Sequence, residues 1–102
     1  MAKGFGLGDM FKIQEKVQQL QKELADKRVE ASAGGGMVRI VANGSQEILE
    51  IHIDPEVVDP EEVEMLEDLI LAAANEARQR AKELMMEEVS KITGGLQIPG
   101  LF

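Results

Sequence analysis

Apolar residues recur along the first part of the chain at alternating steps of three and four. The residues at this spacing are Met10, Ile13, Val17, Leu20 and Leu24. A stripe this narrow is typical of a coiled-coil seam, and Gln and Lys fill most of the remaining faces. We predict a helix over residues 9–27 with Asp9 as its N-cap, preceded by a flexible glycine-rich lead over residues 1–8.

The pattern changes to short strand-forming runs over residues 28–54. Glycine-containing breaks at residues 34–35 and 43–44 divide this stretch into three runs. The second break is Asn-Gly, which is the strongest short signal for a β-hairpin. The stretch therefore predicts a three-stranded antiparallel sheet.

Two-residue loops at both breaks would fix the register of this sheet. The first loop pairs Val29 with Ile40 and, two residues on, Ala31 with Val38. The second loop pairs Val38 with Leu49. All the apolar strand residues then share one face, namely Val29, Ala31, Val38, Ile40, Leu49, Ile51 and Ile53. A one-residue slip would turn every side chain over, so this agreement across two turns supports the strands.

A second, longer helix is predicted over residues 59–93. Asp59 can cap it, Pro60 suits its first turn, and Gly94-Gly95 stops it before a tail over residues 94–102. Such a helix is about 50 Å long, whereas a strand of six residues spans about 20 Å. The second helix must therefore overhang the sheet.

These elements predict one α+β domain over residues 1–102, in the order α-β-β-β-α, with long projecting helices covering the apolar sheet face. The overhang leaves an apolar seam exposed, and exposed seams usually mark interfaces. A symmetric homodimer is the simplest way to bury the same stripe on both copies. The candidate interface residues are Met10, Ile13, Val17, Ala77, Ala81 and Met85.

Charge is distributed unevenly along the chain. The net charge is −8, but residues 1–45 hold seven Lys/Arg against five Asp/Glu, and residues 46–102 hold four against fourteen. The bulk charge is unfavourable for nucleic-acid binding unless the two signs are separated in space. No Cys, apolar signal segment or bilayer-spanning run is present in this sequence. We therefore expect a protein of the reducing cytoplasm with no membrane partner.

Little in the sequence points to catalysis, a metal or a cofactor. His52 is the sole histidine and has no recognisable second ligand. The glycines at 34–36 lack the Lys-Ser/Thr of a phosphate loop, and turn chemistry explains them better. Arg39, on the polar sheet face, is expected to pair diagonally with Glu50. We expect no enzyme, no metal, no cofactor and no small-molecule substrate.

Basic residues are the candidates for binding nucleic acid through phosphate contacts. They are Lys3, Lys12, Lys16, Lys22, Lys27 and Arg28 in and around the first helix, and Arg78 and Arg80 in the second. From the residues alone, an ordinary solvated helix face is the favoured explanation of the first group. For the second group, pairing along the helix with glutamates such as Glu76 or Glu83 is an equal alternative. With only three Phe and no Trp or Tyr, base stacking has little platform, so if nucleic acid is the ligand we expect a duplex rather than a single strand.

Several short stretches occur together in one order. They are a Gly-Leu-Gly lead-in, "MVRIVANG", "IHIDP", "MLEDLILAAANEA" and "GGLQIPGLF". No single stretch is specific, but the ordered set resembles the YbaB/EbfC family of bacterial nucleoid-associated proteins over nearly the whole chain.

The resemblance implies a homodimer built on paired sheets, with helical arms that project like tweezers. It also implies binding to double-stranded DNA with low or modest sequence selectivity, and a role in the nucleoid that can extend to transcription. The alternative is a protein–protein scaffold or a chaperone-like clamp, because helical arms on a small sheet also describe prefoldin-type subunits.

Overall fold

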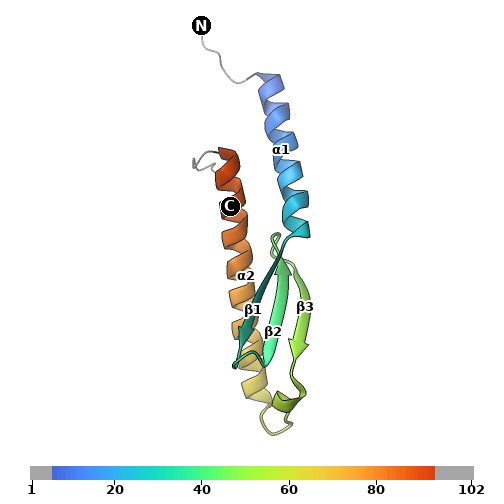
Figure 1. Ribbon diagram of the computed structural model, residues 1–102, viewed down its shortest axis with the longest axis vertical. Helices are drawn as coiled ribbons and strands as arrows, with labels where there is room; N and C mark the ends of the chain where they lie inside the picture. The colour runs from blue at the N-terminus through green and yellow to red at the C-terminus, as the bar shows by residue number, and fades with distance from the viewer. Residues whose placement is uncertain (1–5, 94–102) are drawn as a thin grey trace.

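The computed structural model describes residues 6–93 and shows an elongated molecule of 72 × 20 × 16 Å (Figure 1). Its radius of gyration is 18.9 Å, against about 13 Å for a compact domain of 100 residues. Most of the expected lead, together with Lys3 and the tail at 94–102, lies outside the described residues.

The predicted order of elements and the three-stranded antiparallel sheet are confirmed. The strands lie in the order β1-β2-β3, and a short 3-10 turn, η1, precedes the second helix. The elements are α1 (Leu7–Asp26), β1 (Arg28–Ala33), β2 (Val38–Asn43), β3 (Ile48–Ile53), η1 (Pro55–Val57) and α2 (Val63–Thr93).

Both helices begin differently from the expectation. Gly6 is the N-cap of α1, and Asp9 instead lies in the first turn, where its carboxylate accepts a hydrogen bond of 3.2 Å from the Gly6 amide. Asp59 does not cap α2 directly. Its carboxylate accepts from the Glu61 amide at 3.0 Å and its carbonyl from the Glu62 amide at 2.9 Å, so it forms a separate turn just before the helix.

The first hairpin has a four-residue loop, Gly34–Met37, rather than the two-residue loop that we predicted. Ala31 therefore lies opposite Ile40 instead of Val38, a shift of two residues. Three consecutive glycines with φ of +65°, +68° and +91° permit this wider loop. A shift of two keeps every side chain on its face, so the polar/apolar pattern could not reveal it.

The second hairpin departs further from the predicted register. Val38 lies opposite Ile53, not Leu49, and Leu49 is the extra residue of a β-bulge beside Val41 and Ala42. The loop is again four residues long. The Asn43 carboxamide oxygen accepts from the amides of Ser45 and Glu47, each at 3.0 Å, and so stabilises the wider turn.

The main core lies between the sheet and the first half of α2. The fully buried residues there are Ala31, Val38, Ile40, Ala42, Ala73 and Ala77. Alanines on the helix let its backbone approach β1 and β2 closely. Only α2 covers the sheet, so our expectation that both helices would do so is wrong for α1.

A second, smaller cluster joins α1 to the far half of α2. Leu20, Leu24 and Val89 are buried there, with Leu84 and Met85 partly buried around them. The two helices run antiparallel beyond the end of the sheet, and the first turns of α1 extend past the end of α2 (Figure 1). We call this pair of helices the arm.

Candidate nucleic-acid interface

Several of the predicted DNA-binding cations are already paired within the chain. Lys27 forms an ion pair with Glu88, and Arg28 Nη1 lies 2.7 Å from Glu50 Oε2. Lys27 therefore links the end of α1 to α2, and Arg28 links β1 to β3. Both cations offer less free charge to a phosphate than their sequence positions suggested.

Arg80 is paired in the same way, as the helix-pairing alternative predicted. Its Nη2 lies 2.9 Å from Glu76 Oε1, and its Nη1 donates to the backbone carbonyl of Glu30. Arg80 thus ties the flank of α2 to β1.

The Lys27–Glu88 pair links the end of α1 to α2 inside the arm. The Glu88 side chain is only 11% exposed and also receives Lys91 at 3.4 Å. The hydrogen bond from Lys27 lowers the pKa of the Glu88 carboxyl, and the same bond raises the pKa of the Lys27 ammonium. Both shifts favour the charged forms, so the pair persists at neutral pH.

Other basic residues make no ion pair or side-chain hydrogen bond to any residue in 6–93. On α1 these are Lys12, Lys16 and Lys22, and on α2 they are Arg78 and Lys82. All five side chains are exposed. Lys82 follows Arg78 by four residues, so both lie on one flank of α2.

Acidic charge is concentrated at one end of the molecule, whereas α1 and the second half of α2 carry both signs. Every ionisable side chain between Ile53 and Ala77 is acidic, and most of them lie in η1, the loop that follows it and the first turns of α2. This segment lies at the far end of the molecule from the first turns of α1 (Figure 1). The lysines of α1 are thus separated in space from the main acidic region. An acidic protein needs this separation if it is to bind nucleic acid.

The outer face of the sheet, away from α2, has its charges neutralised locally. Arg39 Nη1 lies 2.8 Å from Glu30 Oε1, so its predicted pairing with Glu50 is wrong. Glu50 instead receives His52 Nε2 at 2.7 Å and Arg28, and these hydrogen bonds, that of His52 first, lower the pKa of its carboxyl.

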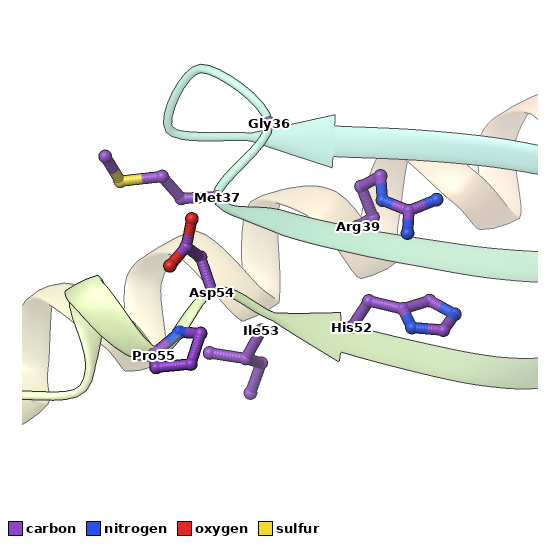
Figure 2. A pocket seen from close by; sticks show the side chains of 7 residues that line it. All are labelled: Gly36, Met37, Arg39, His52, Ile53, Asp54 and Pro55. Carbon is purple, nitrogen blue, oxygen red and sulfur yellow. The ribbon is translucent and has the colours of Figure 1, made fainter.

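Arg39 and His52 also line a shallow hollow of about 360 Å³ near the end of β3, with Met37, Asp54 and Pro55 at its far side (Figure 2). Because Arg39 and His52 both have carboxylate partners, the hollow offers no free positive charge to an anion. It is a weaker candidate than the arm.

The predicted interface residues separate into three groups. Ala77 and Ala81 have no accessible surface, because the side of α2 that bears them packs within the chain's own fold. Val17 and Met85 are partly buried, whereas Met10 and Ile13 are exposed. A partner that binds this chain without changing its fold could contact only part of the predicted stripe.

The sequence reasoning missed an apolar surface on β3. Ile48, Ile51 and Ile53 share the sheet face that α2 covers, but α2 lies over β1 and β2 and leaves them 36–52% exposed. The alternation of residues gave the correct face for Ile51 and Ile53, but it counted Leu49 in this row instead of Ile48, because it could not show the bulge at Leu49. It could not show how far across the sheet one helix would reach.

Within residues 6–93, no helix is both long enough and apolar enough to cross a bilayer. The same residues contain no group of three or more His, Cys, Asp or Glu side chains placed to hold a metal ion.

Comparison with solved structures supports the fold. An uncharacterised protein from Helicobacter pylori, whose crystal structure is known, superimposes with a TM-score of 0.69 over 81% of this chain and 96% of its own. The two sequences are 22% identical, so this likeness concerns the fold alone.

Comparison with known sequences covers nearly the whole chain. A nucleoid-associated protein of Thermoanaerobacter pseudethanolicus is 53% identical over 103 residues, covering 97% of this chain and 93% of that protein. A nucleoid-associated protein of Acetivibrio thermocellus is 61% identical over 92 residues, covering 89% and 81%. The model of the YbaB/EbfC DNA-binding family, a family of DNA-binding proteins rather than enzymes, matches residues 5–96, and the chain therefore belongs to that family.

Proposed function

We propose that this protein binds double-stranded DNA as a homodimer and helps to organise the nucleoid. Contacts are made mainly to the phosphate backbone, with low or modest sequence selectivity. Through its occupancy of DNA the protein can also modulate transcription. Membership in a DNA-binding family and the nucleoid-associated relatives support this function.

One observation carries the proposal for the arm. The exposed lysines of α1, Lys12, Lys16 and Lys22, have no carboxylate partner in the described part of the chain, and they lie far from its acidic end. Free cations on a projecting helix can displace the counterions of duplex DNA, and this release dominates non-specific affinity. Arg78 and Lys82 on α2 are the next candidates for phosphate contacts.

The test is a salt series of binding isotherms with fluorescent duplexes of unrelated sequence. Replacing Lys12, Lys16 and Lys22 with Gln should weaken binding to all duplexes alike. It should also reduce the slope of log affinity against log salt by roughly 0.9 for each phosphate that the variant no longer neutralises.

The matched control removes three cations that are paired within the chain, by the changes Arg28→Gln, Arg39→Gln and Arg80→Gln. This control changes the net charge by the same amount as the lysine variant. It should leave the salt slope closer to that of the wild type. If the lysine variant kept both affinity and slope, α1 would not be the DNA-binding element.

The homodimer is proposed to form through the uncovered apolar face of β3. Ile48, Ile51 and Ile53 form a row along an edge strand, and a two-fold related copy would bury the same row on both chains. Two arms would then project from one platform.

Sedimentation at micromolar concentration tests this interface. Ile51→Glu should convert a dimer into a monomer, because it would place an unpaired charge in the contact. His52→Glu, on the opposite face of the same strand, is the matched control and should stay dimeric. A stable wild-type monomer, or a dimeric Ile51→Glu variant, would exclude this interface.

A scaffold or chaperone-like clamp is the second candidate, because the first turns of α1 expose Leu7, Met10 and Phe11. Such a surface suits an apolar client better than a phosphate backbone. Suppression of client aggregation, with no retention of duplex DNA at low salt, would favour this function over the first.

A further inference from the structure

The Asn43-Gly44 pair of the second hairpin has a chemistry that the proposed function does not use. In an exposed chain, the backbone nitrogen that follows an asparagine can attack the side-chain carbonyl carbon. Glycine permits this attack best, because it has no Cβ to obstruct the approach. Here Asn43 is 3% exposed and Gly44 is buried, whereas the next residue, Ser45, is exposed. A reactive sequence is therefore buried within a surface turn.

The nucleophile of this reaction is held by α1. The Gly44 amide donates to the carbonyl oxygens of Leu24 at 2.8 Å and Lys27 at 3.0 Å, where the end of α1 lies beside the β2–β3 hairpin (Figure 1). Leu24 also covers this glycine, since a Cβ added at Gly44 would lie 2.8 Å from Leu24 Cδ2. The amide proton must leave before the nitrogen can attack. A buried proton that is shared by two carbonyls is shielded from base in water.

The electrophile is held by the hairpin itself. The Asn43 carboxamide oxygen accepts from the amides of Ser45 and Glu47, each at 3.0 Å, and its nitrogen donates to Glu47 Oε1 at 3.1 Å. The two amide donors can stabilise the negative charge that this oxygen gains when its carbon is attacked. None of these bonds involves α1. Release of α1 therefore frees the nucleophile and leaves the electrophile activated.

From this arrangement we propose that Asn43-Gly44 is a latent deamidation site, which becomes reactive when α1 separates from the hairpin. The Gly44 nitrogen loses its proton and bonds to Asn43 Cγ, the bond from Cγ to the side-chain nitrogen breaks, and ammonia leaves with a proton. Water then opens the cyclic imide at either carbonyl, which gives aspartate or isoaspartate at position 43. Water is the only other reactant, so the reaction needs neither DNA nor an enzyme and is independent of the function proposed above.

The product hinders α1 from returning to its place. The new carboxylate replaces the amide that donates to Glu47 Oε1, so two negative groups lie where a hydrogen bond had been. Isoaspartate also adds a methylene group to the backbone, which moves the Gly44 amide relative to the carbonyls of Leu24 and Lys27. Deamidation thus makes a transient opening of the arm permanent.

Mass spectrometry of the full-length protein, kept folded at mildly alkaline pH, measures deamidation at residue 43 over time. The folded wild type should react roughly tenfold or more slowly than the same chain in urea, because only the opened fraction reacts. Leu20→Ala, which weakens the contact between α1 and α2, should raise the rate in the folded protein by roughly tenfold. Asn75, the other asparagine of the chain, lies inside α2 before Glu76 and is the internal control.

Glu88→Gln provides a milder second variant. It removes the ion pair of Lys27, whose carbonyl accepts from Gly44. It should raise the rate at residue 43, though less than Leu20→Ala does. Glu83→Gln is the matched control, since Glu83 makes no ion pair within residues 6–93, and it should keep the wild-type rate.

Three outcomes would overturn the proposal. Equal rates in the folded and the urea-unfolded wild type would mean that the fold does not protect the site. Unchanged rates in both arm variants, while hydrogen exchange shows that α1 opens more often, would mean that the hairpin alone protects it. An equal fold-increase at Asn75 would mean that global unfolding, rather than release of α1, exposes Asn43.

Discussion

The two ends of this molecule are held together very differently. At the platform, formed by the sheet and the first half of α2, six fully buried residues from three elements form one continuous core. In the arm, three buried residues, Leu20, Leu24 and Val89, join two helices, with the Lys27–Glu88 ion pair beside them. The platform is organised by non-local packing, and the arm by a short helix–helix contact.

This difference suggests a division of roles. A densely packed core tolerates few changes, whereas a thin contact between helices opens at lower free energy. The free lysines lie on α1, which is the element with the thinner packing. The all-acidic segment between Ile53 and Ala77 belongs to the platform end. An arm that can adjust its angle suits a ligand such as duplex DNA, whose backbone geometry varies with sequence.

The largest expected effect comes from the platform. Ile40 is fully buried between β2 and α2, and Ile40→Ala should lower the free energy of unfolding by about 2–5 kcal/mol. Urea unfolding followed by far-UV circular dichroism measures this loss, because the chain has no Trp.

Leu20→Ala, a similar truncation in the arm, provides the contrast. It should speed hydrogen exchange of α1 while leaving the unfolding midpoint of the platform nearly unchanged, because α1 can separate without the sheet unfolding. Equal losses of global stability in the two variants would show that arm and platform unfold together, and the comparison would fail.

An intermediate effect is expected at the junction between the two regions. The Gly44 amide donates to the carbonyls of Leu24 at 2.8 Å and Lys27 at 3.0 Å, and a Cβ at Gly44 would lie 2.8 Å from the Leu24 carbonyl oxygen. Since that oxygen belongs to the backbone, Gly44→Ala must displace the end of α1, at a cost of roughly 1–3 kcal/mol.

Gly8→Ala is the matched control, because a Cβ at Gly8 in the first turns of α1 meets nothing within 4 Å. It should leave stability unchanged or raise it slightly, since Ala favours a helix over Gly. Thermal unfolding of both variants is the measurement. A neutral Gly44→Ala would mean that the end of α1 is not fixed against the second hairpin.

Gly44 also shows where sequence reasoning reached the right element for an incomplete reason. The Asn-Gly pair correctly predicted a turn, but we took the glycine to serve a two-residue loop. Its φ is not positive, the residue with φ of +66° is Gln46, and Gly44 is needed because α1 passes so close. A contact between segments this distant in the sequence leaves no mark on the local pattern of residues.

The elements and their faces were predictable because periodicity records burial. The order α-β-β-β-α and the apolar seam of α1 follow from it directly. Periodicity does not record which partner buries a residue. The stripe from Met10 to Met85 was therefore treated as one interface, although Ala77 and Ala81 pack inside the chain. Ion pairing is equally invisible to it, and this is why Lys27 and Arg28 looked as available as Lys12.

The smallest expected effect is a pH-dependent loosening of the arm at the Lys27–Glu88 pair. The folded pKa of Glu88 lies below its usual value of 4.5, so the stabilisation is complete above that value and is lost as pH falls through the lowered one. The folded pKa of Lys27 lies above its usual 10.5, so its contribution is complete below 10.5 and is lost as pH rises through the raised value. The pair should therefore hold the arm across the neutral range and release it at both extremes.

Spin labels on Gln18→Cys and Gln79→Cys can report this release, since both side chains are exposed and one lies on each helix. The distribution of distances between them should broaden in acid for the otherwise wild-type chain, and already at neutral pH when Glu88→Gln is added. Glu83→Gln removes a nearby carboxylate that makes no ion pair within residues 6–93, and it should keep the narrow distribution at neutral pH. If Glu88→Gln behaved like Glu83→Gln, the apolar contacts of Leu20, Leu24 and Val89 alone would hold the arm, and its opening would not respond to pH.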